Sequence, residues 1–233
     1  MLPGGRVDPC DRESAVRDLL PPAVAVAVAE PADWTGELYA VEAACLGERA
    51  VDSRRRDFTA GRVCARRAMA MLGLPAVAVP AGADRSPVWP PGTVGTITHT
   101  RGYCAAAVGR TSEIRAVGMD AEQHRVLGAE VSRLICLPEE EEQHDRLPSG
   151  VAWSTVVFSA KETVYKIWHP IVGDWLGFHD ALVELDPATA TFTARIAPAR
   201  IDAAGSPHPP SVITGRFAVD ANLVRTAAVL PPR

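Results

Sequence analysis

The sequence predicts an α+β protein with two similar α/β lobes, divided near residue 115. Each half of the chain contains a group of helical patterns and a few short strand-like segments, most of them suited to antiparallel pairing. The two longest helical patterns, 52–72 and 153–168, lie one in each half. No strong sequence repeat relates the halves. We therefore expect an N-terminal lobe at 1–115 and a C-terminal lobe at 116–233, each with a small, mostly antiparallel sheet and packed helices.

The first half is expected to combine three helices with several short strands. Val24, Val26 and Val28 alternate with Ala, so the three valines should share one face of a strand. Gly73 and Pro75 should end the longest helix of this half. In chain order, we expect a helix at 12–20, a strand at 23–30, helices at 36–46 and 52–72, a brief strand at 76–79, a turn-rich loop at 81–92, and strands at 95–100 and 103–108.

The second half is expected to begin with a strand and to end with a hairpin. Pro170 should stop the long helix of this half. The acidic run 139–142 follows Pro138 at a helix start, where carboxylates favour the positive end of the helix dipole, and we interpret it as solvated surface. In chain order, we expect a strand at 117–122, helices at 126–136, 138–145 and 153–168, and strands at 176–185, 191–196, 212–219 and 223–230.

Composition restricts the class of protein. The 233 residues are 47% hydrophobic and 22% charged, which is ordinary for a globular chain. A formal net charge of −4 argues against a general nucleic-acid binder. The five cysteines are scattered, which indicates reduced thiols rather than a disulfide framework. No stretch reaches the apolar length of a membrane span, and residues 21–29 make a poor signal peptide. We expect a cytoplasmic protein.

Two short motifs carry the chemistry. Asp120 and Glu122 stand two residues apart in Val-Gly-Met-Asp-Ala-Glu, so on a strand they share one face. Glu162 and Lys166 stand four residues apart in a helical pattern, which also places them on one face. Three carboxylates and an ammonium suit Mg²⁺ together with a phosphate-bearing ligand, because Mg²⁺ takes oxygen ligands and commonly shares substrate phosphates.

Each motif taken alone has a simpler interpretation. Asp120 and Glu122 could form the solvated face of an edge strand. Ser159 and Glu162 fit a capping box at a helix start, and Glu162 with Lys166 fits an ordinary surface pair contributing about 0.2–0.5 kcal/mol. All of these coincidences would have to occur together, so we favour a site.

Basic residues upstream could bind the phosphates of such a ligand. Arg54, Arg55, Arg56 and Arg62 lie along the predicted long helix, and arginine suits phosphate because its planar fork offers paired donors. His99, in Thr-Ile-Thr-His-Thr, could donate to a phosphate from a strand end. The arginines are equally compatible with a decorated surface helix, and a lone histidine is more often structural.

The motifs, in this order, resemble those of the 4'-phosphopantetheinyl transferases, and the resemblance covers nearly all of residues 45–230. It is closest to the monomeric members that activate siderophore, polyketide and nonribosomal-peptide carrier proteins. The resemblance implies a fusion of two related lobes, a pseudo-dimer, with coenzyme A bound between them. It also implies Mg²⁺, or Mn²⁺ in its place, at Asp120, Glu122 and Glu162. Its implied contacts with coenzyme A are Arg54, Arg62, Arg85, Thr98, His99, Asp120, Lys161 and Lys166.

This resemblance implies transfer of the 4'-phosphopantetheine arm of coenzyme A to a serine of an apo acyl or peptidyl carrier protein, with adenosine 3',5'-bisphosphate as the second product. Glu162 would accept the serine proton, and Lys166 would neutralise developing charge. Lys161 would contact phosphate or dock the carrier. Ala121 separates the two acids, so water would complete that part of the metal shell. Which arginine of 54–56 binds the 3'-phosphate stays open.

Two other functions remain compatible with the residues. A different Mg²⁺-dependent enzyme acting on a nucleotide is one, although the chain has no Gly-x-x-x-x-Gly-Lys loop for a triphosphate. A protein that only binds coenzyme A or carrier domains is the other, although a pure binder has no use for a metal triad.

Overall fold

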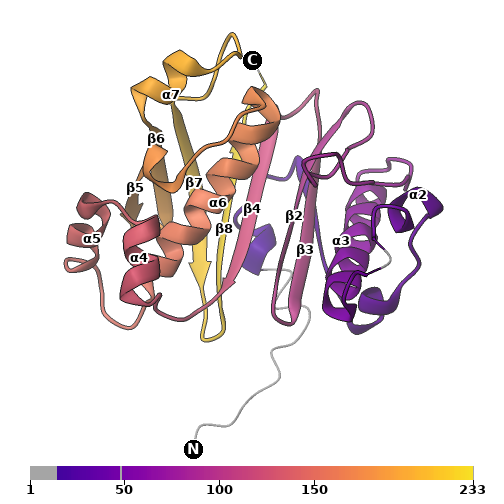
Figure 1. Cartoon of the computed structure of the whole chain (residues 1–233), viewed down its shortest axis with the longest axis horizontal. Helices are drawn as coiled ribbons and strands as arrows, with labels where there is room; N and C mark the ends of the chain where they lie inside the picture. Colours follow the sequence, from indigo (N-terminus) through magenta and orange to yellow (C-terminus); the bar gives the residue numbers. More distant parts are fainter. Residues whose placement is uncertain (1–14, 48, 233) are drawn as a thin grey trace, which may run out of the picture.

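The computed structural model describes residues 15–47 and 49–232. The described chain forms two antiparallel sheets with helices packed on them, an α+β architecture with two lobes (Figure 1). One sheet has the strand order β1-β3-β2, and the other has the order β4-β8-β7-β6-β5. The first sheet lies before residue 115 and the second lies after it. Within these residues, no helix is both long and apolar enough to span a membrane.

Each lobe combines one long helix with short helices and antiparallel strands. The first lobe contains β1 (Val24–Val28), the 3₁₀ helix η1 (Pro31–Thr35), α2 (Ala40–Ala43), α3 (Asp52–Met71), β2 (Thr93–Thr100) and β3 (Tyr103–Arg110). The second lobe contains β4 (Ala116–Gln123), α4 (Ala129–Ile135), α5 (Pro138–His144), α6 (Trp153–Val172), the 3₁₀ helix η2 (Phe178–Asp180), β5 (Ala181–Asp186), β6 (Thr191–Ile196), α7 (Pro198–Ala203), β7 (Val212–Val219) and β8 (Leu223–Leu230).

The first sheet is apolar on both faces. Its alanine face packs on α3, where Ala27 and Ala106 meet Ala65 and Ala68 of the helix. Its valine face instead forms a core with strands of the second lobe, and this core contains Val24, Val26, Val28, Ala105, Ala107, Val117, Met119 and Ala227. The predicted shared face of the three valines is confirmed. Burial of apolar surface is the main favourable force in folding and association. This shared core therefore holds the two lobes together.

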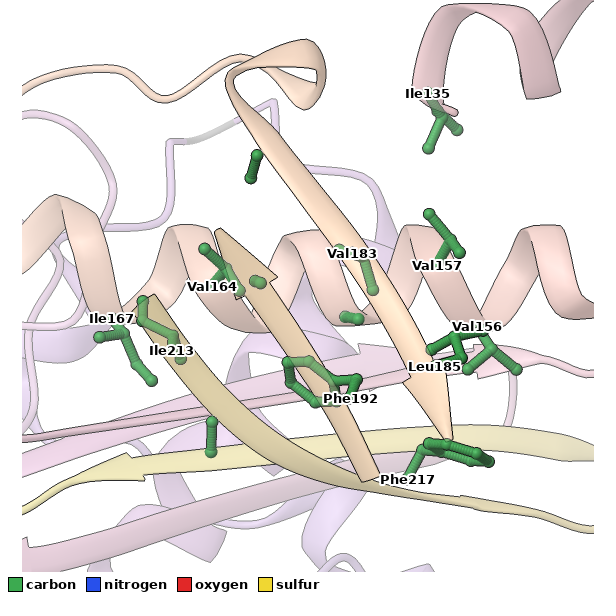
Figure 2. Close-up of a cluster of buried hydrophobic side chains, with 14 of the residues drawn as sticks. Ile135, Val156, Val157, Val164, Ile167, Val183, Leu185, Phe192, Ile213 and Phe217 are labelled. Atoms are coloured by element: carbon green, nitrogen blue, oxygen red, sulfur yellow. The ribbon is translucent and has the colours of Figure 1, made fainter. Parts of the chain in front are cut away.

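The core of the second lobe lies between α6 and the five-stranded sheet (Figure 2). Figure 2 shows Val157 and Val164 of α6 together with Val183, Phe192 and Ile213 of three strands. Gly118 lets this helix approach β4 closely, because a Cβ atom there would overlap the carbonyl oxygen of Thr163. The glycine of the first motif therefore brings the helix of the second motif against the strand of the first.

Several predicted elements differ from the observed ones. Residues 76–79 form no strand, because their backbone groups bond to side chains: Val79 N donates to Glu42, and Ala76 O accepts from Tyr39. Proline at 170 does not end α6, which continues to Val172 and stops at Gly173 with φ +77°. A proline in the last turn removes only one hydrogen bond, so neighbouring packing can outweigh it.

The remaining differences concern element ends and short helices. Strand β5 begins at Ala181 rather than at residue 176, since the preceding residues turn through η2. The sequence analysis did not predict η1 or α7, and it made α2 and α4 too long. Residues 12–14 of the first predicted helix lie outside the described residues, while residues 15–17 are helical. The other expected strands and helices are present, with ends shifted by a few residues.

Candidate active site

Asp120 lies at the junction of the two lobes, where β2 runs beside β4 (Figure 1). Its side chain is only 6% exposed. Thr98 of β2 donates to Oδ1 at 3.1 Å, and Ser159 of α6 donates to Oδ2 at 2.9 Å. Lys166 Nζ lies 2.7 Å from Oδ1 and also donates to the carbonyl of Met119. The interpretation of Asp120 as part of a solvated edge is therefore wrong.

Glu122 and Glu162 lie close enough to Asp120 to feel its charge. Partial burial raises the pKa of Glu122 to about 7, Asp120 and Glu162 raise it too, and Lys166 opposes them. Burial also raises the pKa of Glu162, with Asp120 adding to the effect and Lys166 opposing it. The structure therefore gathers the three acids and Lys166 in one electrostatic cluster, as the two motifs predicted. Such perturbed groups are typical of functional sites.

The chemistry of this cluster fits a divalent cation. Like charges that raise each other's pKa values are relieved by a cation held between them. Across residues 15–47 and 49–232, no three acidic, histidine or cysteine side chains form a ready-made metal cage. Mg²⁺ does not require such a cage, since it usually keeps waters and shares substrate phosphates. Asp120, Glu122 and Glu162 are the residues that would hold it.

Helix α6 begins six residues before Ser159, so the capping-box interpretation is also wrong. Ser159 is fully buried in the second turn of the helix and points at Asp120. Glu162 and Lys166 follow on the same side of α6 and line a cleft. Ser159, Glu162 and Lys166 therefore lie on the side of α6 that faces β4, and they do not form a helix start.

The cleft lies between the lobes and measures about 540 Å³, a size typical of ligand sites. One wall is α6, which contributes Glu162, Tyr165, Lys166 and His169. The other wall consists of β2 residues and a loop of the first lobe, including Asp84, Arg85, Ser86, Pro87, Trp89, Gly95, Thr96 and Ile97. Asp84 and His169 approach to 3.6 Å across it.

Arg54 and Arg62 share the ring of Phe58. The Arg62 guanidinium lies 3.8 Å from the ring centroid, and that of Arg54 lies 6.0 Å from it. Arg62 is 6% exposed and donates through Nε to the carbonyl of Val79. Burial lowers the pKa of Arg62 to about 10, and nearby Arg54 contributes to this. Two cations held together, with Arg62 buried and Arg54 exposed, favour an anionic ligand.

His99 lies close enough to both Arg54 and Asp120 to interact with them electrostatically. Its ring nitrogen Nδ1 lies 3.8 Å from Asp57, and both Arg54 and Lys166 act on it electrostatically. Arg85 is exposed on the wall of the cleft and adopts a φ of +68°. A positive φ at a residue other than glycine is strained, and such residues are enriched at functional sites. Arg85 thus adds one exposed cation to the cleft wall of the first lobe.

Lys161 does not face the cleft, contrary to the expectation from the sequence. Its side chain is 2% exposed and forms an ion pair with Glu140 at 2.7 Å. The ammonium also donates to the carbonyls of Ile135 and Phe178, each at 2.8 Å. All three of its donor positions are therefore used inside the protein. A contact with phosphate or with a docked partner contradicts this geometry, and we leave Lys161 out of the site.

Glu139, Glu141 and Glu142 of the acidic run are exposed, as expected, but Glu140 is not. It is 1% exposed, and besides Lys161 it accepts from the backbone amides of Leu137 and Val183, each at 2.7 Å. This buried pair joins α5, α6 and β5. It thereby fixes the helix turn that carries Glu162.

The sequence analysis missed several residues of the cleft. Tyr165 stands three residues after Glu162, which was a usable signal for the same helix face. The rings of Tyr165 and Trp175 lie 5.0 Å apart between centroids and are tilted by 56°, beside a narrow recess lined also by Leu176 and Phe178. Trp175 gave no signal, because its segment has no regular period.

Comparisons with known proteins identify the family. Residues 41–109 match a family model described as the 4'-phosphopantetheinyl transferase N-terminal domain, and residues 116–209 match that of the 4'-phosphopantetheinyl transferase superfamily. The 4'-phosphopantetheinyl transferase PptT of Mycobacterium tuberculosis is 40% identical over 81% of this chain and 85% of its own length. Svp of Streptomyces mobaraensis is 40% identical over 71% and 68%, and Npt of Nocardia iowensis is 42% identical over 59% and 62%. Both carry the same enzyme name.

Proposed function

Since the chain belongs to the 4'-phosphopantetheinyl transferase family, we propose that it performs this transfer with Mg²⁺ on apo acyl or peptidyl carrier proteins. The substrate is coenzyme A, and the products are holo carrier protein and adenosine 3',5'-bisphosphate. The observation that carries the proposal is the meeting of Asp120, Glu162 and Lys166 at the cleft between the lobes.

The reaction requires a proton acceptor and a means of holding charge. The carrier serine oxygen attacks the phosphorus that bears the pantetheine arm, and the bond to the adenosine 3',5'-bisphosphate breaks. Glu162 accepts the serine proton, directly or through a water, and its raised pKa suits a general base that works near neutral pH. Lys166 holds Asp120 in place and faces the cleft, where it neutralises charge on phosphate oxygens. When bound at the three acids, Mg²⁺ supplies electrostatic stabilisation of the pyrophosphate.

The basic residues of the first lobe would bind the phosphates of coenzyme A. We assign the 3'-phosphate to Arg54 and Arg62, which lie together over Phe58. We assign His99 to the pyrophosphate, because it lies within the field of both Arg54 and Lys166. Arg85 would contact the adenosine end from the cleft wall. Thr98 serves through its hydrogen bond to Asp120.

The pantetheine arm would lie in the cleft between the lobes, against Trp89, Ile97 and Tyr165 and beside Glu162. The arm would then extend away from the phosphates, leaving the phosphorus near Glu162.

The carrier protein would dock beside α4. Val126 and Leu134 are 75% and 71% exposed, and Val131 is 47% exposed, although all three are apolar. Arg125 and Arg133 belong to the same segment, and both reach solvent. Apolar side chains with basic neighbours suit an acidic carrier domain, and this segment directly follows the strand of Asp120 and Glu122. The docking surface thus takes the place of the one expected around Lys161.

We further propose that the protein acts as a monomer in the cytoplasm, where coenzyme A and reducing conditions are found. Four cysteines, at 45, 64, 104 and 136, are free thiols, which supports a reducing compartment. Carriers of siderophore, polyketide or nonribosomal-peptide synthesis are the proposed partners.

The test is transfer itself. The protein is incubated with coenzyme A, Mg²⁺ and several apo carrier proteins, and each carrier is weighed as an intact molecule. We expect at least one carrier to gain one phosphopantetheine group, and the same carrier with its serine replaced by alanine to gain none. Glu162→Gln should lose the transfer, while Glu184→Gln on β5, at an exposed position, should keep it. Tight binding of coenzyme A without a gain in mass on any carrier would favour a binding protein instead.

A further inference from the structure

A chain of buried hydroxyl groups leads through the second lobe to Asp120. Thr163 Oγ1 lies 2.7 Å from Thr226 Oγ1, which lies 2.9 Å from Ser159 Oγ, which in turn lies 2.9 Å from Asp120 Oδ2. Ser159, Thr163 and Thr226 are fully buried. They come from α6 and β8, and Thr226 stands directly opposite Asp120 in the pairing of β8 with β4.

The proton of Ser159 can be assigned by counting. A hydroxyl donates one proton, and a carboxylate only accepts. Ser159 must therefore donate to Asp120. Thr226 Oγ1 lies 2.9 Å from both Oγ and the carbonyl oxygen of Ser159. The Ser159 proton points at the carboxylate, and the hydroxyls of Thr226 and Thr163 lie behind it.

We propose that this chain is a positioning device that fixes the Asp120 carboxylate for the cation, with Thr226 as its central positioning residue. Thr226 contacts both the hydroxyl and the carbonyl oxygen of Ser159, so it holds the side chain that donates to Oδ2 in one place. Thr98 and Lys166 hold Oδ1. Hydrogen bonds therefore hold both oxygens of the Asp120 carboxylate. The carboxylate keeps one orientation, in which it would bind the metal ion.

This inference rests on the proposed function, because it assigns Asp120 to the metal. It differs from a packing role for Thr226, which would depend on the methyl group and not on the hydroxyl. Valine keeps the shape of threonine without the hydroxyl, and serine keeps the hydroxyl without the methyl. The two substitutions at this position therefore separate the roles.

The experiment measures metal binding and not turnover. The melting temperature of the full chain with coenzyme A is followed as Mg²⁺ is added, and Mn²⁺ binding is measured by electron paramagnetic resonance. We expect Thr226→Val and Ser159→Ala to raise the half-saturating metal concentration by about 10- to 100-fold, the usual effect of removing a partner of a metal ligand. Thr226→Ser should leave it within about threefold of the wild type, though it lowers the melting temperature.

Thr155→Val is the matched control. Its buried hydroxyl donates to the carbonyl of Arg125 and lies outside the chain, so metal affinity should not change. The inference would be overturned if Thr226→Ser and Thr226→Val changed the half-saturating metal concentration equally, or if neither changed it. This comparison does not depend on whether Ser159→Ala folds. A wild type that binds neither metal would overturn the proposed function as well, whereas binding that these variants leave intact would overturn this inference alone.

Discussion

The half-buried carboxyl of Glu122 should make the stability of the metal-free protein depend on pH. Its pKa is raised from 4.5 to about 7, first by burial and then by Asp120. A carboxyl whose pKa is higher in the folded protein than in the unfolded chain favours folding only while it is protonated. The stabilisation is fully present below about pH 4.5 and is lost as the pH rises through about 7.

The size of the effect follows from the pKa change. A rise from 4.5 to about 7 corresponds to at most about 3.4 kcal/mol, at about 1.36 kcal/mol per unit. Since solvent reaches part of this side chain and screens its interactions, we expect about half of that, about 1.5–2 kcal/mol. Glu122→Gln has nearly the same shape but no charge. Its free energy of unfolding should match the wild type near pH 4 and exceed it by about 1.5–2 kcal/mol near pH 8.

The assay is urea unfolding at each pH in the presence of EDTA. Glu184→Gln, at an exposed carboxyl paired with Arg195, is the control and should show a far smaller dependence. Saturating Mg²⁺ should close the difference between the wild type and Glu122→Gln, because the cation stabilises the ionised carboxylate. A difference between these two proteins that stays constant from about pH 4 to pH 8 would refute the assigned environment of Glu122.

Four further predictions test the site and its surroundings. Lys161→Met should lower the free energy of unfolding by about 3–5 kcal/mol, because it leaves Glu140 buried without its partner, while the KM for carrier protein stays unchanged. EDTA should abolish transfer, Mg²⁺ or Mn²⁺ should restore it, and full activity in a chelated sample would exclude the metal. By calorimetry, Arg54→Ala should weaken coenzyme A binding by about 1.5–3 kcal/mol but leave dephospho-coenzyme A binding as it is; equal losses would mean that this arginine does not bind the 3'-phosphate. Leu134→Glu should raise the KM for carrier protein about fivefold or more without changing that for coenzyme A, and an unchanged KM would place docking on another face.

Local patterns were sufficient to predict the frame of the site. A spacing of two residues placed Asp120 and Glu122 on one face of a strand, and helical spacing placed Glu162 and Lys166 on one side of α6. Both patterns depend only on backbone geometry, which neighbouring lobes do not alter. The α+β class followed for the same reason, since short strands and two long helices could be read without knowing how they pack.

The role of Lys161 could not be predicted this way. Spacing shows which face of a helix a side chain occupies, but it does not show what packs against that face. Glu140 lies twenty-one residues earlier in an acidic run that looks solvated from the sequence alone. Only the packing of α5 against α6 buries it and gives Lys161 a partner. A charge that is buried needs such a partner, so the pair depends on tertiary structure and not on local sequence.

The burial of Asp120 follows from the association of the lobes. Its strand, β4, stands at the edge of the five-stranded sheet, where an acidic side chain would ordinarily meet water. Strand β2 of the other lobe covers that edge and supplies Thr98. The same contact brings the cleft wall of the first lobe opposite Glu162 and Lys166. The acids, the ammonium and the facing wall of the first lobe therefore meet only because an apolar core joins the two sheets.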